Sequence, residues 1–311
     1  MRIFLAGATG ALGQHLAPML VGAGHDVVGT TRSPAKATAL RAAGVEPAVV
    51  DALDRAAVHE AVAKAEPDVV IHQVTALAGM SVPRRFDEQF AQTNRLRTEG
   101  LDILLAAAEA AGARRFVAQS YAGWPFERVG GPVKDEEAPL DPHTSAPATL
   151  AAIRHLEAAV GGVPGLDGIA LRYGGFYGPG TSLGAGGDVV EMVRKRRFPV
   201  VGAGTGIFSF CHIEDAARAT LAAVEGGPPG IYNVVDDEPA PVSQWLPFLA
   251  RAVGAKPPRR VPGWLARPLI GAQGMVVMTS ARGASNAKAK RELRWAPRYP
   301  SWRDGFVNGL G

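Results

Sequence analysis

The first half of the chain alternates short apolar runs, rich in β-branched residues, with longer amphipathic stretches. Residues 2–7 (RIFLAG) predict a buried strand, and residues 12–24 predict a helix because Leu12, Leu16 and Leu20 recur on one helical face. Further strands are expected at 26–32, 46–51, 67–74, 114–120 and 166–175, with helices at 34–44, 55–65, 88–112 and 147–160. This alternation predicts a parallel sheet that is covered by helices on both faces and joined by right-handed crossovers.

The alternation weakens after Gly175, where glycine and proline become frequent. We still expect a helix at 188–197, a strand at 230–235 and a second helix at 243–254. The pattern as a whole predicts an α/β fold: a Rossmann-type doubly wound parallel sheet with a smaller, discontinuous C-terminal substrate lobe. The predicted division gives a dinucleotide-binding core at 1–174, rejoined by about 213–236, and a substrate-capping lobe at 175–212 and 237–311.

Composition narrows the functional classes. The chain has 311 residues and a net charge of +4, and its single cysteine, Cys211, excludes an internal disulfide and argues against a cysteine-based metal site. No apolar run approaches the roughly 20 residues that a membrane helix needs, so we expect a soluble cytoplasmic protein. The basic run at 194–197 has no aromatic platform beside it, which argues against nucleic acid. A small-molecule substrate, no metal and a monomer or homodimer are expected.

Three glycines between the first strand and the first helix carry the clearest chemical signal. Gly7, Gly10 and Gly13 follow a G-x-x-G-x-x-G spacing in the segment FLAGATGALGQHL. Such glycines permit a tight turn and let backbone N–H groups approach a pyrophosphate, which then lies on the positive end of the helix. We therefore predict a dinucleotide site at this turn.

The end of the second strand bears on the choice between NAD and NADP. A site for NAD usually places an acidic residue there, but this chain has Arg32 and Ser33 and no acid nearby. An arginine can pair with the 2′-phosphate of NADP, so NADP is favoured and NAD stays possible. Asp51, after the third strand, could accept from the adenine amine or could instead cap the next helix.

The chain resembles the extended short-chain dehydrogenase/reductase family, in its NAD-dependent epimerase/dehydratase group, over nearly its whole length. Beyond the glycine motif, Asn94 fits the helix that usually reads N-x-x-G-T. Four residues fit the stretch after the sixth strand: Arg172, Tyr177, Gly178 and Pro179. His212 and Asp215 fit a further signature, although a cap between a strand and a helix explains this pair as well. The resemblance implies a Rossmann domain, a substrate lobe and a catalytic Ser/Thr, Tyr and Lys.

The catalytic pair of this family is missing from its expected place. Glu157 matches the glutamate that follows the family's lysine by four residues, which puts Ile153 at the lysine position and Thr149 at the tyrosine position. No Tyr-x-x-x-Lys occurs anywhere in the sequence. The chain therefore resembles an atypical branch. Tyr121, with Ser120 beside it, is the candidate proton donor or substrate anchor; the alternative is a structural role as a partly buried tyrosine bonded to the backbone.

The sequence thus gives a set of candidate residues and three candidate functions. The predicted cofactor site comprises Gly7, Thr9, Gly10, Leu12, Gly13, Arg32, Ser33, Asp51, His72, Gln73 and Phe176. The favoured function is an NADP-dependent oxidoreductase that acts on a carbonyl or hydroxyl group of a small, apolar substrate. The alternatives are an epimerase or dehydratase reaction with bound cofactor, and a non-catalytic NAD(P)-binding module. Several large apolar residues suggest an apolar pocket or plain core packing: Trp124, Trp264, Leu269, Met275 and Met278.

Overall fold

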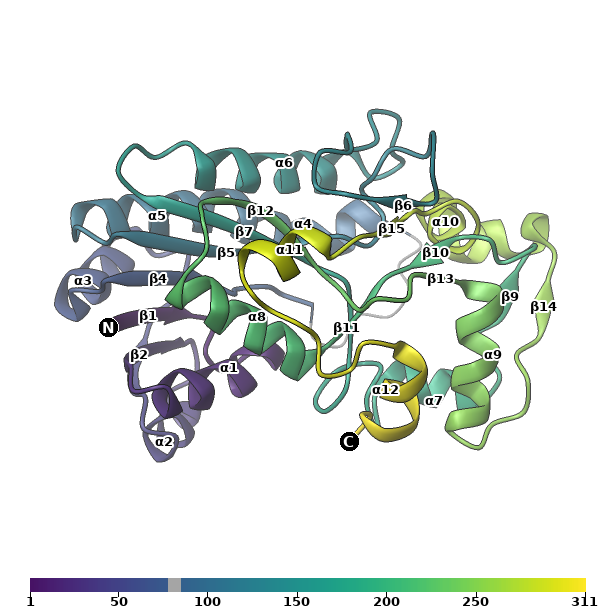
Figure 1. The fold of residues 1–311 in the computed structure, drawn as a ribbon, viewed down its shortest axis with the longest axis horizontal. Helices are drawn as coiled ribbons and strands as arrows, with labels where there is room; N and C mark the ends of the chain where they lie inside the picture. Colours follow the sequence, from purple (N-terminus) through teal and green to yellow (C-terminus); the bar gives the residue numbers. More distant parts are fainter. Residues whose placement is uncertain (78–84) are drawn as a thin grey trace.

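A seven-stranded parallel sheet forms the centre of the computed structural model, which describes residues 1–77 and 85–311 (Figure 1). The strand order is β12-β7-β5-β4-β1-β2-β3, and every neighbouring pair is parallel. The strands are β1 (Arg2–Ala6), β2 (Asp26–Thr31), β3 (Glu46–Val49), β4 (Val69–His72), β5 (Arg115–Tyr121), β7 (Asp167–Tyr173) and β12 (Gly230–Val234). The predicted doubly wound α/β fold is confirmed.

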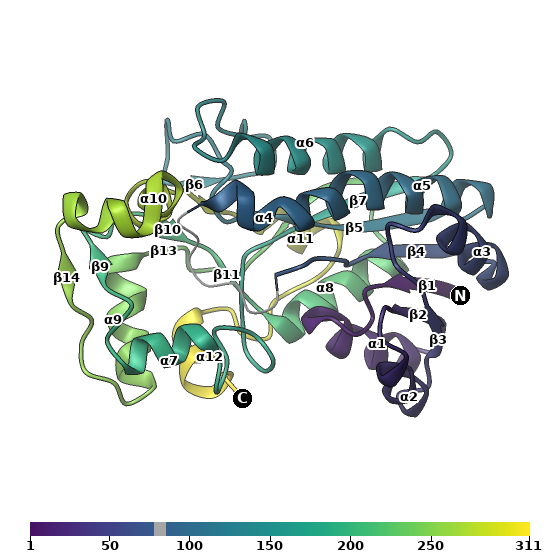
Figure 2. The same ribbon diagram turned by 180° about the vertical axis from the view of Figure 1, so that it is seen from behind.

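Helices cover both faces of the sheet, as Figures 1 and 2 show from opposite sides. On one face α1 and α8 pack together and share a buried core with β1 and β7; α3, α5 and α6 share a second core with the other face. The helices of this part are α1 (Ala11–Gly22), α2 (Pro34–Ala42), α3 (Arg55–Ala65), α4 (Phe86–Arg95), α5 (Leu101–Ala110), α6 (Pro147–Gly161) and α8 (Ile213–Glu225). The sequence pattern located all of them except α8, with α4 and α5 expected as one helix.

Most of the remaining segments gather beside the C-terminal edge of the sheet, whereas α11 packs against β12. They form two-stranded pairs, β8 with β11, β9 with β14, β10 with β13 and β6 with β15, together with further helices. Their bounds are β6 (Val133–Lys134), β8 (Gly175–Tyr177), α7 (Asp188–Arg194), β9 (Val200–Val201), β10 (Ile207–Phe208), β11 (Phe210–His212), β13 (Ala240–Pro241), α9 (Val242–Ala252), β14 (Arg260–Val261), α10 (Gly263–Thr279), β15 (Gly283–Ala284), α11 (Ala287–Glu292) and α12 (Trp302–Asn308). A core around Trp245 and Trp302 draws all its buried members from 175–212 and 237–311. The lobe boundaries themselves stay a prediction.

Two helices depart from the expected regular form. The single helix expected at 88–112 consists of α4 and α5 joined by a π-helical turn, η1 (Leu96–Gly100). Helix α10 bends at Gly271, whose φ of +69° is not helical. Irregular turns of the π type often occur at functional sites, so the residues of η1 are candidates for the site.

A buried ion pair fixes α6 against the middle of the sheet. In α6, Glu157 accepts from Nε and Nη2 of Arg172 in β7, each at 2.7 Å, and both side chains are buried. The hydroxyl of Ser120 in β5 donates to the same carboxylate at 2.7 Å. A two-pronged arginine–carboxylate contact is geometrically specific, so these three residues set how α6 sits on β5 and β7.

Glu157→Gln is expected to lower the free energy of unfolding by about 3 kcal/mol or more, because it leaves the Arg172 charge buried without a counter-ion. Urea unfolding followed by circular dichroism measures this. The matched control is Glu99→Gln, whose exposed ion pair with Arg95 is worth less than about 1 kcal/mol. Equal losses in the two variants would mean that the buried pair has no special weight.

Candidate functional site

The turn between β1 and α1 has the backbone that a dinucleotide site needs. Gly7 has a φ of +92°, and a Cβ atom there would lie 2.7 Å from the carbonyl oxygen of Gln73. A Cβ atom at Gly13 would lie 2.3 Å from the carbonyl oxygen of Gly7. Both positions therefore require glycine for the turn and for close packing of helix and strand.

The N-terminus of α1 is left open toward the outside of this turn. Gly10 is the exposed N-cap residue; no side chain caps the helix, and its first turn has no acidic residue. Thr9 steadies the turn through a 3.3 Å hydrogen bond between its hydroxyl and that of Thr31, and Leu12 anchors the helix in the core. Uncapped helical N–H groups and the helix dipole favour a phosphate at this position. The residues present fit a dinucleotide.

The end of β2 presents a free cation. Arg32 is exposed and makes no hydrogen bond or ion pair through its side chain with any residue that the structure describes. Ser33 follows as the N-cap of α2, with its backbone N–H bonded to the hydroxyl of Thr31. Asp51 is exposed, and its carboxylate accepts from the backbone N–H of Leu53 at 3.0 Å.

The alternative role for Asp51 as a helix cap is wrong. The cap of α3 is Asp54, whose carboxylate accepts from the backbone N–H of Ala57 at 3.1 Å. Both aspartates precede the helix, and only the one that directly adjoins its first residue has the geometry to cap it. The role of Asp51 at the adenine stays a prediction.

Three further predicted cofactor residues come from different places in the chain: His72 ends β4, Gln73 follows it, and Phe176 lies in β8. Nε2 of His72 is 3.1 Å from the carbonyl oxygen of Leu96, and burial lowers the pKa of His72 to about 4, so the ring is neutral at pH 7. The side-chain amide of Gln73 donates to the hydroxyl of Tyr173 at 3.3 Å, and the ring of Phe176 lies against Tyr173. Their contact with the cofactor stays a prediction.

The segment at the family's dyad position forms helix α6, as the sequence predicts. The Thr149 hydroxyl donates to Asp87 at 2.6 Å and accepts from the side-chain amide of Asn94 at 3.1 Å. The Asp87 carboxylate also accepts from the backbone N–H groups of Ala148 and Thr149, so α4 supplies the cap that α6 lacks in its own sequence. Thr149 is therefore occupied in joining two helices, and it has no group that could act as a phenolic acid.

Ile153, at the lysine position, is equally committed to packing. Its side chain is 1% exposed and lies in an apolar cluster with Trp124 and Leu150. The ring of Phe86 packs edge-on against Trp124, with centroids 5.4 Å apart. Tyr121 packs against this cluster, so the place of the missing dyad is a buried apolar cluster with a phenol at its margin.

The two predicted catalytic residues differ in what they can reach. Ser120 is 1% exposed and gives its hydroxyl to Glu157, which favours a positioning role over contact with a substrate. Tyr121 ends β5 and is half-buried, with its ring over Gly123, where a Cβ atom would meet the phenol oxygen. Burial raises the pKa of Tyr121, so the phenol is neutral at pH 7 and can donate a hydrogen bond.

One charged residue near Tyr121 was missed by the sequence reasoning. Arg97 lies in the π-helical turn η1 and is 3% exposed. Burial lowers the pKa of Arg97 to about 10, and the groups whose charges act on it are Tyr121 and Glu157. A signal existed in the sequence, because Arg97 stands where the family's N-x-x-G-T pattern has glycine.

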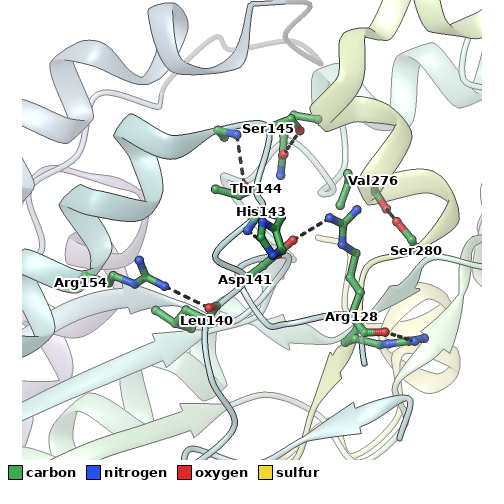
Figure 3. Close-up of polar contacts among 12 residues, drawn as sticks. Arg128, Leu140, Asp141, His143, Thr144, Ser145, Arg154, Val276 and Ser280 are labelled. Atoms are coloured by element: carbon green, nitrogen blue, oxygen red, sulfur yellow. Dashed lines mark hydrogen bonds and ion pairs between the residues drawn. The ribbon is translucent and has the colours of Figure 1, made fainter. Parts of the chain in front are cut away.

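A polar cavity of about 340 Å³ lies between α10 and the segment that precedes α6. Figure 3 shows Arg128, His143, Ser145, Val276 and Ser280 around it, with Arg128 paired to Asp141 at 2.9 Å. A second cavity, of about 550 Å³, is lined by residues of α10. The five large apolar residues do not line one pocket. Trp264 and Met275 line the second cavity, Leu269 is exposed, and Trp124 and Met278 are buried.

Two further features of the described residues bear on the expectations. No helix among residues 1–77 and 85–311 is long and apolar enough to cross a membrane. The same residues contain no group of three or more His, Cys, Asp or Glu side chains that could hold a metal ion. His212 caps α8 by accepting from the backbone N–H of Glu214, as expected of the pair, whereas Asp215 instead accepts from the backbone N–H groups of Arg298 and Tyr299.

Known proteins resemble this chain over its whole length. The model of the NAD dependent epimerase/dehydratase family matches residues 3–234. A 3-diazoavenalumate denitrifying reductase from Streptomyces sp is 46% identical over 98% of this chain and 99% of its own length. A farnesyl-dihydroquinoline-oxide ketoreductase from Stigmatella aurantiaca is 30% identical over 82% of this chain and 74% of its own. The UDP-glucose 4-epimerase of Thermus thermophilus, solved with NAD, has a TM-score of 0.76 and 25% identity, covering 100% of this chain and 98% of that one.

Asp87→Ala is expected to lower the free energy of unfolding by about 1–2 kcal/mol, because α6 loses its cap and Thr149 loses its acceptor. The control is Glu88→Ala, which removes an exposed carboxylate from the same turn of α4 and should cost less than about 0.5 kcal/mol. Urea unfolding measures both variants, with NADPH affinity expected to stay unchanged in each. An unchanged free energy of unfolding in Asp87→Ala would show that the contact between α4 and α6 makes no net contribution to stability.

Proposed function

We propose that this chain, which belongs to the NAD-dependent epimerase/dehydratase family, is an NADP-dependent reductase that removes a diazo group from a small substrate. At the coarser level the chain is an NAD(P)-dependent oxidoreductase or epimerase-like enzyme that takes a nicotinamide cofactor. The cofactor supplies a hydride. What the residues of this chain must supply depends on which group accepts that hydride.

The observation that carries the proposal is the chemistry of the dyad positions. Reduction of a carbonyl needs a hydride and also a proton for the oxygen, which a positioned acid supplies. Here Thr149 is bonded to Asp87 and Asn94, and Ile153 is buried in an apolar cluster. A site without the usual acid suits an acceptor that needs no proton.

A diazonium group is such an acceptor. In net terms the hydride forms a new C–H bond, the C–N bond breaks, and dinitrogen leaves, so that R–N₂⁺ and H⁻ give R–H and N₂. Charge and atoms balance without an external proton. The buried apolar cluster around Ile153 would also exclude water, which would otherwise compete for the same carbon.

The relatives support this substrate class. The Streptomyces protein that is 46% identical over nearly the whole of both chains is named as a denitrifying reductase of 3-diazoavenalumate. The suffix of that substrate names an anion, and its prefix names the group that is lost. We therefore expect a diazo compound as the substrate of this chain as well.

Carbonyl reduction is the second candidate, and Tyr121 is the residue that favours it. Its phenol is neutral, lies at the C-terminal end of β5 and could donate to a carbonyl oxygen in place of the missing tyrosine. The relative that is 30% identical over 82% of this chain is named as a ketoreductase. The two candidates differ in whether turnover depends on this phenol.

The cofactor site is assigned in the same proposal. Gly7, Gly10 and Gly13 bring backbone N–H groups and the open end of α1 to the pyrophosphate. Arg32 and Ser33 hold the 2′-phosphate of NADP, because an arginine that has no partner among residues 1–77 and 85–311 offers paired donors to a phosphate.

Arg32→Asp should reverse a preference for NADPH over NADH, through lost pairing and new repulsion. A charge-assisted hydrogen bond is worth about 1.5–3 kcal/mol, so the affinity ratio should shift by at least roughly tenfold. Fluorescence titration with both cofactors measures it, and Arg41→Asp, which changes an exposed residue at the end of α2, is the control. Tighter binding of NADH by the unaltered protein would refute the role of Arg32.

Turnover is tested with a matched pair of probes, para-toluenediazonium and para-methylacetophenone, in the presence of NADPH. For the diazonium we expect release of one N₂ per NADPH consumed and transfer of deuterium from labelled NADPH to the ring carbon. Because that reaction needs no proton, Tyr121→Phe and Thr149→Ala should keep its rate within a factor of about three. Gly10→Val, which fills the pyrophosphate space, should abolish it and thereby measures the uncatalysed background.

The ketone distinguishes the two candidate functions. Reduction of para-methylacetophenone that falls by about 10²-fold or more in Tyr121→Phe would favour the ketoreductase, since that is the scale of a positioned acid. Absence of N₂ release above the Gly10→Val background, beside such a ketone activity, would replace the proposed function with the second candidate.

A further inference from the structure

Arg97 has three features that lower the free energy of unfolding and that are therefore unexpected unless the residue has a function. Its side chain is 3% exposed, it lies in an irregular π-helical turn, and it makes no hydrogen bond or ion pair with residues 1–77 or 85–311. Its Nε atom is completely enclosed and has no partner in this part of the chain. A buried cation without a bonded counter-ion is strongly unfavourable.

The neighbouring contacts place the turn that carries Arg97 against α6, the helix that holds the dyad positions. Asn94, three residues before Arg97, bonds to Thr149 at the start of α6, and η1 packs against the same helix. Arg97 therefore lies about one helical turn after Asn94, just as Ile153 lies one turn after Thr149 in α6. The lysine that the family carries at position 153 is absent, and a different cation enters from the adjacent helix.

The charged groups around Arg97 leave it available. Glu157 is the carboxylate whose charge acts on it, but both oxygens of that carboxylate are already held by Arg172 and one also accepts from Ser120. Tyr121 is the other group, and its phenol is neutral at pH 7. The positive charge of Arg97 is thus not balanced by either neighbour.

We propose that Arg97 binds an anionic oxygen of the substrate, a carboxylate or a phenolate, next to Tyr121. The inference rests on the proposed function and narrows it to diazo compounds that carry such an oxygen. The anion supplies the missing counter-charge, so the cost of burying the guanidinium is recovered when substrate binds. The same charge repels the diazonium end of the molecule, and the two forces together fix the orientation of the substrate.

Binding is tested first, because it needs no turnover. Benzoate is the product expected from para-carboxybenzenediazonium, and its affinity for the protein with NADP⁺ is measured by calorimetry. Arg97→Met should weaken benzoate binding by about 10- to 100-fold, the scale of a charge-assisted hydrogen bond, while NADP⁺ affinity is unchanged. Arg97→Lys should retain part of the affinity. Arg95→Met, which changes an exposed residue of the same helical segment, should retain all of it.

Thermal stability distinguishes this role from a purely structural one, because the two roles predict opposite changes in the unfolding temperature of Arg97→Met. Arg97→Met removes an uncompensated buried charge, so the unliganded variant should unfold at the same temperature as the original protein or a higher one. A clear fall in this temperature would show that Arg97 supports the fold and would overturn the proposal. So would benzoate binding that is unchanged in Arg97→Met, or a parallel loss of NADP⁺ binding.

Turnover then separates this inference from the proposed function. The ratio of kcat/KM for para-carboxybenzenediazonium to that for para-toluenediazonium should fall about 10- to 100-fold in Arg97→Met, and a diazophenol arm tests the phenolate in the same way. An unchanged ratio in both arms, with N₂ still released, contradicts the anion site alone. Benzoate or phenolate held through Arg97 without N₂ release from any diazonium contradicts the proposed function alone.

Discussion

The bidentate ion pair between Glu157 and Arg172 is the interaction on which the geometry of the site depends. It joins α6 to β7 in the interior, and Ser120 extends the contact to β5. Tyr121 is the next residue along β5, so its place at the sheet edge follows from the same network. An ion pair of this kind specifies one arrangement of helix on sheet, because any shift of α6 would leave two charges buried without partners.

The same network explains why the positive charge of the family's lysine could be supplied from another element. In α6, Glu157 faces the sheet and binds Arg172. One and two turns earlier, Ile153 packs in the apolar cluster and Thr149 bonds to Asn94 of α4. With lysine absent from α6, the cation at this place comes from η1, where an irregular turn carries the long side chain of Arg97. Glu157 is saturated by its own partners and therefore does not neutralise that cation. The site keeps a positive charge that is free to meet an anion.

Much of the fold could be predicted from the sequence because its signals are local. Strand β1, the glycine turn and α1 follow from periodicity and spacing within about twenty residues, and the structure confirms all three. The contacts that define the candidate site are not local. Asp87 meets Thr149 across 62 residues, and Glu157 meets Arg172 only because two elements pack in one register. Nothing in the neighbourhood of Asp87 marks it as a cap for a helix so far along the chain.

Arg97 shows how a departure from a pattern can be informative even when its meaning is not visible in one dimension. Periodicity gives a continuous helix at 88–112, on which an arginine would be expected to face water. The π-helical turn adds a residue to the turn and changes the direction of the side chains that follow, so the guanidinium is buried. Two substitutions that look unrelated in the sequence, isoleucine for lysine at 153 and arginine for glycine at 97, then act on the same site. The first removes a cation that would serve an acid, and the second supplies a cation that suits an anionic substrate.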